Sequence, residues 1–371
     1  MTTYADQFAA FDGIYLLSHS VGRPPISAAD AINRDFIAPW IEGQAGGWTS
    51  WLASIDRFRA AVAGLLNTAT AAVCPQVNLS GAMTKVLGSL PRPERRSTLL
   101  LSEDDFPSMA FVMQQAQSLG YQLKFIPAEE NTLDTDVWRR YLTDEVAFTL
   151  VTHVHSNSSR LHPAREIIHL ARDRGVKTIF DIAQSVGAVP IDLEAIDPDF
   201  TVGSCVKWLC GGPGAGFLCV RADMIPRCQP TDVGWFSHED PFEFDIHHFR
   251  YAPDALRFWG GTPSVAPYAL AANSIGLIND IGVDVIRAHN QQLIQHMIDA
   301  VDPVTIRSPL EPATRGGTLV LHFGEQHKHI TGRLERANVH FDSRATGIRL
   351  SPHLYNDMLE INTVIERLFV N

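Results

Sequence analysis

The chain has 371 residues, of which 45% are hydrophobic and 19% charged, and its formal net charge is −11 at pH 7. This length exceeds one small core and predicts two lobes, while the acidic balance gives no electrostatic reason to expect nucleic acid or an anionic membrane as a partner. No stretch approaches the ~18 apolar residues of a membrane span, so we do not expect the chain to cross a membrane.

The cysteines and the start of the chain indicate a compartment. The five cysteines form an odd set without the paired spacing of a zinc site, so we expect reduced, mostly buried thiols and no metal. The first residues lack the basic end and apolar run of an export signal. Together these features predict a cytoplasmic protein.

The first part of the chain predicts one short strand and several helices. A strand that begins at residue 14 runs into a turn at Gly22, and helical spacing of apolar residues follows. The helices expected here lie at 28–41, 54–67 and 79–90. A brief strand and a turn over 72–80 open the last of them.

From residue 98 onward, strands and helices alternate. The expected strands lie at 98–102, 122–126, 146–153, 178–181 and 200–204, with a further strand that ends at Val220. The helices expected between them lie at 108–119, 134–142 and 163–174. Several strands are continuously apolar, which predicts a mostly parallel sheet covered by helices on both faces.

The C-terminal part follows a different pattern. Two long helices are expected in succession, over 269–281 and 283–301. Beyond Pro303, short strands alternate with helices, which predicts a small α+β lobe. These elements are expected at 318–323, 330–337, 349–351 and 356–369.

Two charged residues follow apolar strands. Asp181 comes directly after Ile179 and Phe180, and Lys207 comes just after the strand at 200–204. Ligands of an open parallel sheet lie at the carboxyl ends of its strands, so both side chains should face one site. A lysine can form a Schiff base with an aldehyde cofactor, and an aspartate can keep a pyridine nitrogen protonated. The pair predicts pyridoxal 5′-phosphate, although each residue alone could be a surface lysine or a turn residue.

The motifs around this pair extend to most of the chain. They are D-I-A-Q-S-V-G from Asp181, K-W-L-C-G-G-P-G from Lys207, D-F-P-S from Asp105, G-W-F-S-H-E from Gly234, G-T-P from Gly261 and R-L-S-P-H-L-Y-N from Arg349. Together they resemble the class V aminotransferase family of fold type I pyridoxal-phosphate enzymes, and within that family the kynureninases most. The resemblance implies an α/β fold with a mostly parallel sheet between helices and a small C-terminal α+β lobe.

The resemblance also implies a domain organisation. The expected parts are an N-terminal segment that packs with the small domain (1–50), a large cofactor-binding domain (51–265), and a connecting helix with the small C-terminal domain (266–371). Members of this fold build their cofactor site between two subunits, so a homodimer with shared active sites and an amino acid substrate are expected.

The resemblance also implies a role for each residue that matches a family motif. Lys207 and Asp181 would hold the cofactor and take part in catalysis, Phe106 would stack on its ring, and Arg349 would bind the substrate α-carboxylate. The further residues expected at the cofactor are Ser204, Gln184, Gln76, Val77, Trp235 and Thr262. His19 and Ser20 are candidates for the substrate pocket.

Simple physical chemistry is consistent with parts of this assignment. The loop at 76–78 precedes a helix, and free N–H groups at a helix start can hold a phosphate, although an ordinary helix start remains the alternative. Gln184 could hydrogen-bond the phenolic oxygen of the cofactor or only cap the next turn. Phe106 could equally be core, and Arg349 could form a surface ion pair.

Three positions depart from the kynureninase pattern. Val206 stands where kynureninases carry a tyrosine, Met109 where they carry an aspartate, and Gln184 where they carry a histidine. Kynureninase-like hydrolysis of an amino acid is the first expectation for the reaction. Transamination and β-elimination, including C–S lysis, are the alternatives, and a non-enzymatic sensor that binds pyridoxal phosphate is a third. No cysteine follows Cys228, which argues against a persulfide-forming desulfurase.

Overall fold

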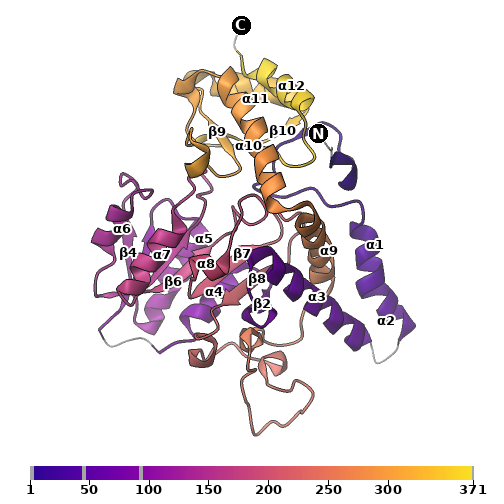
Figure 1. Ribbon diagram of the computed structural model, residues 1–371, viewed down its shortest axis with the longest axis vertical. Helices are drawn as coiled ribbons and strands as arrows, with labels where there is room; N and C mark the ends of the chain where they lie inside the picture. Colours follow the sequence, from indigo (N-terminus) through magenta and orange to yellow (C-terminus); the bar gives the residue numbers. More distant parts are fainter. Residues whose placement is uncertain (1–3, 44–46, 92–94, 370–371) are drawn as a thin grey trace.

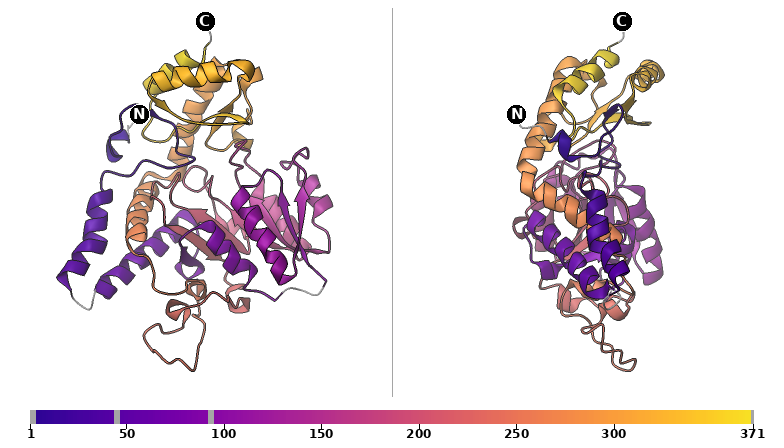
Figure 2. Two further views of the ribbon diagram at one scale, coloured as in Figure 1. Left: turned by 180° about the vertical axis from the view of Figure 1, so that it is seen from behind. Right: turned by 90° about the vertical axis from the view of Figure 1, so that its right-hand side faces the viewer.

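In the computed structural model, residues 4–43, 47–91 and 95–369 are described. A large body contains the main sheet, and a smaller lobe built from the C-terminal part stands above it (Figure 1). The N-terminal segment runs beside both parts and reaches the small lobe near its start (Figure 2). This arrangement places the junction of the two parts above the carboxyl ends of several central strands.

The main sheet has seven strands in the order β2-β8-β7-β6-β5-β3-β4. Strand β8 is antiparallel to both of its neighbours, and the remaining pairs are parallel. The bounds are β2 Val73–Gln76, β3 Thr98–Ser102, β4 Gln122–Ile126, β5 Val146–Thr152, β6 Lys177–Asp181, β7 Phe200–Ser204 and β8 Gly216–Val220. The mostly parallel sheet expected from the apolar strands is therefore confirmed.

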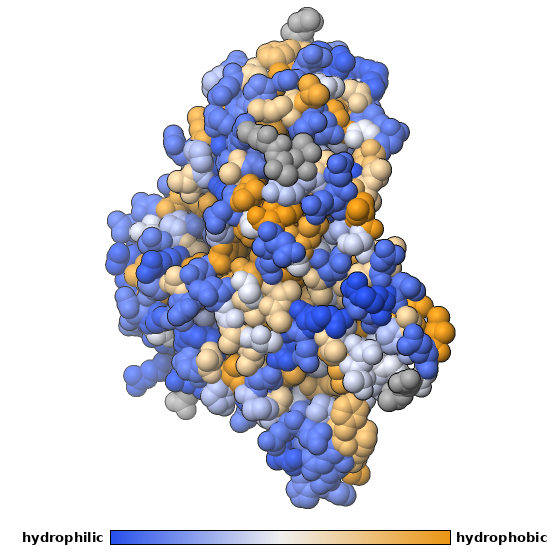
Figure 3. All heavy atoms as spheres, turned by 45° about the vertical axis from the view of Figure 1, so that its right-hand side comes forward, coloured by the Kyte–Doolittle hydropathy of each residue, from blue (hydrophilic) through white to orange (hydrophobic). Residues whose placement is uncertain are grey.

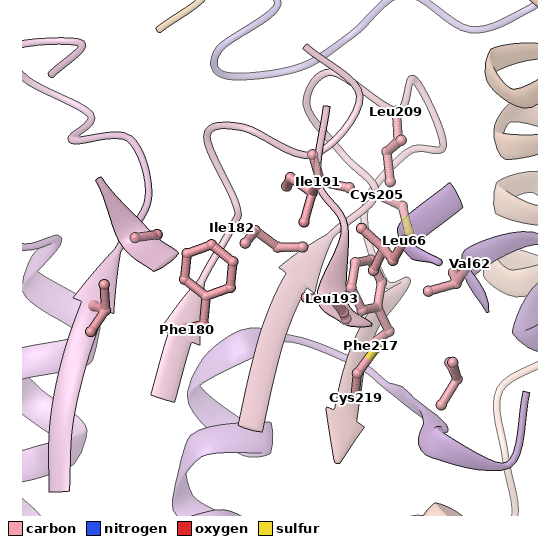
Figure 4. Close-up of a cluster of buried hydrophobic side chains, with 14 of the residues drawn as sticks. Val62, Leu66, Phe180, Ile182, Ile191, Leu193, Cys205, Leu209, Phe217 and Cys219 are labelled. Atoms are coloured by element: carbon pink, nitrogen blue, oxygen red, sulfur yellow. The ribbon is translucent and has the colours of Figure 1, made fainter. Parts of the chain in front are cut away.

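Helices cover both faces of this sheet. Two separate clusters of buried apolar side chains lie on its two sides, one under α4 and α5 and the other under the remaining helices. Figure 4 shows part of the second cluster, where Val62 and Leu66 pack near Phe217 and Cys205. The helices are α3 Trp48–Leu66, α4 Leu79–Leu87, α5 Pro107–Gln115, α6 Thr135–Tyr141, α7 Ala164–Asp173, α8 Leu193–Ile196 and α9 Ala266–Ile281.

The small lobe has its own core and includes the start of the chain. Strands β9 (Leu319–Leu321), β11 (Asp342–Arg344) and β12 (Gly347–Leu350) form an antiparallel sheet. Strand β1 (Ile14–Tyr15) pairs in parallel with β10 (Val339–His340) and thereby joins the N-terminal segment to this lobe. The helices of the lobe are α10 Val283–Ala300, α11 His327–Arg336 and α12 Met358–Leu368. The domain boundaries at residues 50 and 265 stay a prediction.

Two of the expected helices differ in their limits or continuity. Helix α3 begins at Trp48 instead of residue 54, and the ring of Trp48 packs 5.5 Å from that of Trp235 in a distant segment. The helix expected over 28–41 is interrupted. It consists of α1 (Ala28–Ile32), a π-helical turn and α2 (Ala38–Glu42).

A long loop after Trp235 projects from the base of the large body, at the bottom of Figure 1. Several of its apolar side chains are exposed, and tan and orange hydrophobic atoms lie at the lower end of the molecule in Figure 3. These exposed residues are Phe242, Phe244, Ile246 and Phe249. Within the described part of the chain, no single helix is long and apolar enough to cross a membrane; only the pair α9 and α10, bent by 79°, meets that test jointly by length and composition.

Candidate active site

Lys207 lies on a loop that follows β7 and is held from several sides. The N–H of Cys205 donates to the carbonyl of Ala215 across the base of the loop, at 3.0 Å. The N-terminal segment contributes the N–H of Gly22, which donates to the carbonyl of Val206 at 2.8 Å. From the small lobe, Nε2 of His353 is 3.0 Å from the carbonyl oxygen of Trp208. Parts of the chain that are far apart in sequence therefore fix the lysine.

The amine of Lys207 lies in an environment that favours its neutral form. Burial lowers the pKa of Lys207 below its ordinary value, and the positive charges of Arg349 and Arg344 act in the same direction. The carboxylate of Asp181 opposes this effect. Only a neutral amine attacks an aldehyde, so this environment suits Schiff-base chemistry.

Asp181 ends β6 and is buried at the carboxyl edge of the sheet. The N–H of Ala183 donates to its Oδ1 at 2.8 Å, which fixes the carboxyl group. Burial raises the pKa of Asp181, whereas this hydrogen bond and the charge of Lys207 lower it. A buried carboxylate is stabilised by a cationic or N–H partner, so a protonated ring nitrogen would suit this position.

Phe106 is positioned by the residue before it. Asp105 accepts hydrogen bonds from the N–H of Ser102 at 2.7 Å and from the hydroxyl of Thr152 at 2.6 Å, which ties the turn to β3 and β5. Phe106 is then the N-cap of α5, and its ring lies 5.8 Å from Nζ of Lys207. The aromatic face is therefore presented to the lysine.

These residues line one cavity of about 180 Å³ at the carboxyl ends of the strands. At one side stands the N-terminus of α4, where Asn78 caps the helix by accepting from the N–H of Gly81 at 2.8 Å. The lining residues are Asn78, Leu79, Ser80, Phe106, Ser108, Met109, Thr152, Val154, Ser156, Asp181, Ala183, Gln184, Ser204 and Lys207. The structure thus brings Lys207, Asp181, Gln184, Phe106 and Ser204 together.

Arg349 approaches this cavity from the small lobe. It lies on β12, only 2% of its side chain is exposed, and its Nη1 donates to the carbonyl of Ser156 in the cavity wall at 2.8 Å. Its other edge is held by Asp342, whose Oδ2 lies 2.6 Å from Nε. The guanidinium therefore stands at the junction of the two parts of the molecule.

Arg349 itself is not among the residues that line the cavity, and the other expected cofactor residues also lie outside it. Gln76 turns its amide to the carbonyl of Phe258, and Val77 is 59% exposed at a neighbouring hollow. Trp235 and Thr262 lie together, with Nε1 of the tryptophan 3.3 Å from the threonine hydroxyl, but neither lines the cavity that holds the lysine. The single chain thus leaves these residues apart from the candidate site.

The two substrate-pocket candidates occupy different environments. His19 is buried between the N-terminal segment and the small lobe, with Nδ1 2.6 Å from the hydroxyl of Ser351 and Nε2 3.9 Å from Asp342. Burial lowers its pKa to about 4, so its ring is neutral at pH 7. Ser20 is exposed in the following turn. Gln184 contacts this segment through its amide, which donates to the carbonyl of His19 at 3.1 Å.

Some residues at or near the site were not singled out from the sequence. Asn78 is not one of them, because it ends the 76–78 loop that was expected to hold the phosphate, and it caps α4 as an asparagine before a helix commonly does. Ser156 follows β5 at the same edge of the sheet as Asp181, so the strand pattern could have predicted that it lies near the site. Asp342 had no such signal, because β11 is a strand of three residues. Its importance appears only from its contact with Arg349.

The described residues offer neither a cluster of metal ligands nor a reactive thiol. No group of three or more histidine, cysteine or acidic side chains there could hold a metal ion. All five cysteines are free and buried, and burial raises the pKa of the Cys205 thiol well above its ordinary value. The thiols are therefore poor candidates for a nucleophile.

Comparison with known proteins identifies the family. The model of the class-V aminotransferases matches residues 49–362. The chain belongs to the class-V aminotransferase family. A kynureninase from Deinococcus radiodurans is 30% identical over 82% of this chain and 74% of its own length. An uncharacterized aminotransferase of Bacillus subtilis, YcbU, is 28% identical over 86% and 85% of the two chains.

Solved structures agree on the fold. A C-DES mutant with glycine covalently linked to its PLP cofactor matches with a TM-score of 0.89, covers 99% of both chains and is 21% identical. The cystine C–S lyase C-DES in complex with cysteine persulfide matches with a TM-score of 0.86, covers 96% of this chain and 97% of its own, and is 21% identical. The expected α/β fold of type I is confirmed.

The cofactor of this family is pyridoxal 5′-phosphate, and the prediction of this cofactor is confirmed. The cavity fits the group by its donor set. It combines a lysine of lowered pKa with a buried carboxylate, an aromatic face and a helix N-terminus lined by Asn78 and Ser80. These would serve the aldehyde, the ring nitrogen, the ring face and the phosphate.

Proposed function

We propose that the chain is a pyridoxal-phosphate enzyme that acts on an α-amino acid, with kynureninase-like hydrolysis as the first candidate reaction. The observation that carries this proposal is the convergence of Lys207, Asp181 and Phe106 on one cavity, with Arg349 bonded to Ser156 in the cavity wall. The bound cofactor would supply an electron sink for the carbanion formed at the substrate Cα.

Each of these residues would have a definite task. Arg349 would bind the substrate α-carboxylate and so orient the bond to be broken. Lys207 would move the proton at Cα. Asp181 would keep a proton on the ring nitrogen, and Phe106 would fix the ring plane.

A second candidate reaction is favoured by two residues near the lysine. Met109 is buried in the cavity wall where the resemblance expects an aspartate, and Val206, beside Lys207, replaces a tyrosine. Neither side chain can transfer a proton, which favours transamination or β-elimination, including C–S lysis, over hydrolysis. Among the described residues every cysteine is buried, so C–S lysis here would proceed without a cysteine persulfide on the enzyme.

We also propose that the active sites are shared within a homodimer. Trp235 and Thr262 contact each other away from the cavity of their own chain, although both match cofactor-binding motifs. The exposed apolar side chains of the projecting loop, among them Phe244 and Ile246, lie close in sequence to Trp235 and would be covered by a second subunit. The buried free cysteines support a reducing compartment such as the cytoplasm.

Product analysis distinguishes these reactions. Purified holoprotein would be incubated with a panel of L-amino acids that includes kynurenine, while the visible absorption of the cofactor is followed. Hydrolysis of kynurenine consumes water and yields anthranilate and alanine. Transamination yields an oxo acid. β-Elimination releases cysteine persulfide from cystine or sulfide from cysteine, in each case with pyruvate and ammonia. A spectral change without any product would support a sensor, and no response to any amino acid would overturn the proposal.

A further inference from the structure

The charged groups at the base of the β11–β12 hairpin form one connected cluster. Asp342 and Arg349 are directly opposite each other in the antiparallel register, so their side chains share one face of the hairpin. Oδ2 of Asp342 lies 2.6 Å from Nε and 2.5 Å from Nη2 of Arg349. The carboxylate therefore holds the arginine along its side, through the Nε–Nη2 edge.

A second arginine repeats this arrangement. Nε of Arg344 lies 3.2 Å from the same Oδ2 of Asp342, and its Nη1 donates to Oδ1 of Asn157 at 2.9 Å. Arg349 donates in the same way to the carbonyl of Ser156. Both arginines thus bridge from Asp342 in the small lobe to consecutive residues of the loop that follows β5 in the large body.

The contacts of Arg349 leave one edge for a ligand. A guanidinium carries five N–H groups. Asp342 accepts from one on Nε and one on Nη2, and Ser156 accepts from one on Nη1. One N–H on each terminal nitrogen is left by these contacts, and Nη1 is bonded to Ser156, which lines the cavity that holds Lys207. Two such N–H groups match the two oxygens of a carboxylate.

We propose that Asp342 is a positioning residue for substrate binding: by gripping the Nε–Nη2 edge of Arg349, it leaves the terminal edge aimed at the α-carboxylate. The inference rests on the proposed role of Arg349 and adds to it the group that sets its orientation. Arg349 is 2% exposed and Asp342 30%, so the arginine is the buried partner and the aspartate anchors it from the rim.

A different role for Asp342 predicts the opposite result. If the aspartate served only to balance positive charge, it would compete electrostatically with the substrate carboxylate. Its removal would then leave Arg349 and Arg344 uncompensated and would tighten carboxylate binding. If it positions Arg349, its removal frees the guanidinium to rotate and weakens carboxylate binding. The sign of the change therefore separates the two roles.

The test uses two probes that differ only in the carboxylate, L-alanine and ethylamine. Holoenzyme is titrated with each, and the dissociation constants are taken from the change in cofactor absorption. For Asp342→Ala we expect alanine binding to weaken by about 10- to 100-fold, as for loss of a charge-assisted hydrogen bond, with ethylamine binding unchanged. Asp342→Asn retains an acceptor oxygen, so we expect a smaller loss of alanine affinity, of about threefold.

A control substitution and a folding check accompany the measurement. Ser343→Ala changes the neighbouring residue on the opposite face of β11 and should leave both constants unchanged. Thermal melting verifies that each variant folds; if Asp342→Ala does not, the Asp342→Asn result alone decides by its sign. Unchanged or tighter alanine binding, or an equal loss for alanine and ethylamine, would overturn the inference. If Arg349→Ala leaves the preference for alanine over ethylamine intact, the role of Arg349 itself fails, which is a separate result.

Discussion

The Cα of Gly22 packs against the backbone carbonyl of Lys207 so closely that an added Cβ would stand 2.2 Å from that oxygen. The same glycine donates its N–H to the carbonyl of Val206. The N-terminal segment therefore packs directly against the backbone of the loop that carries Lys207. Glycine is required here because the two backbones approach too closely to leave space for a Cβ.

The first prediction concerns this contact. Gly22→Ala should force the two backbones apart, with a loss of about 1–3 kcal/mol in the free energy of unfolding, as for other overpacked sites. It should also displace Lys207 and lower the affinity for pyridoxal phosphate. Urea unfolding of the apoprotein and titration with the cofactor measure the two effects.

Gly276 provides the matched control. It lies within α9, and a Cβ added there would meet nothing within 4 Å. Gly276→Ala should therefore stabilise the protein, by roughly 0.5–1 kcal/mol, because alanine favours the helix. Equal effects of the two substitutions would show that the contact at Gly22 has no special role.

The second prediction uses the lowered pKa of Lys207. Because only the neutral amine reacts, the rate at which apoprotein combines with pyridoxal should rise with pH and level off below pH 10.5, the ordinary lysine value. Asp181 raises this pKa and Arg344 lowers it. Asp181→Asn should thus move the midpoint to lower pH, and Arg344→Ala should move it to higher pH. Shifts in the same direction would contradict this account of the site.

The core of the site could be predicted from sequence because its residues follow strands. Asp181 and Lys207 come after apolar runs, and the carboxyl ends of parallel strands must meet. The positions of Trp235 and Thr262 could not be placed this way, because Trp235 begins a short 3-10 helix and Thr262 lies in a bend, and neither follows a strand of the sheet. Strand β11, which carries Asp342, was missed because three residues are too few for a periodic pattern, whereas its partner β12 was expected as a strand at 349–351.

A third prediction follows from the buried histidine under the lysine loop. Burial lowers the pKa of His353 to about 4, and its ring contacts the carbonyl of Trp208 and the N–H of Leu354. The unfolded chain takes up a proton on this ring below pH 6.5, whereas the folded protein does so only near pH 4. Stability is therefore fully present above pH 6.5 and falls as the pH drops towards 4, by about 1.4 kcal/mol per pH unit for this group.

Unfolding in urea at a series of pH values measures this slope. His353→Gln should remove about one proton from the difference between the folded and unfolded states and so flatten the profile between pH 6.5 and 4. The exposed His329→Gln serves as the comparison. An unchanged slope for His353→Gln would show that another group governs acid stability.

The fourth prediction concerns the shared sites. Lys207→Ala and Trp235→Ala should each be inactive or nearly so as homodimers. If Trp235 completes the site of the other subunit, a heterodimer of the two variants contains one intact site, and an equal mixture should recover about a quarter of wild-type activity by random pairing. If Trp235 serves its own chain, every heterodimer has one lesion in each site and the mixture stays inactive.

The central claim is that Lys207 forms the covalent link to the cofactor. Reduction of the holoprotein with borohydride fixes a Schiff base as a stable secondary amine, and peptide mapping by mass spectrometry then locates it. We predict a pyridoxyl-phosphate adduct on Lys207, with the visible absorption lost in Lys207→Ala. An adduct on another lysine, or none after incubation with excess cofactor, would contradict the account.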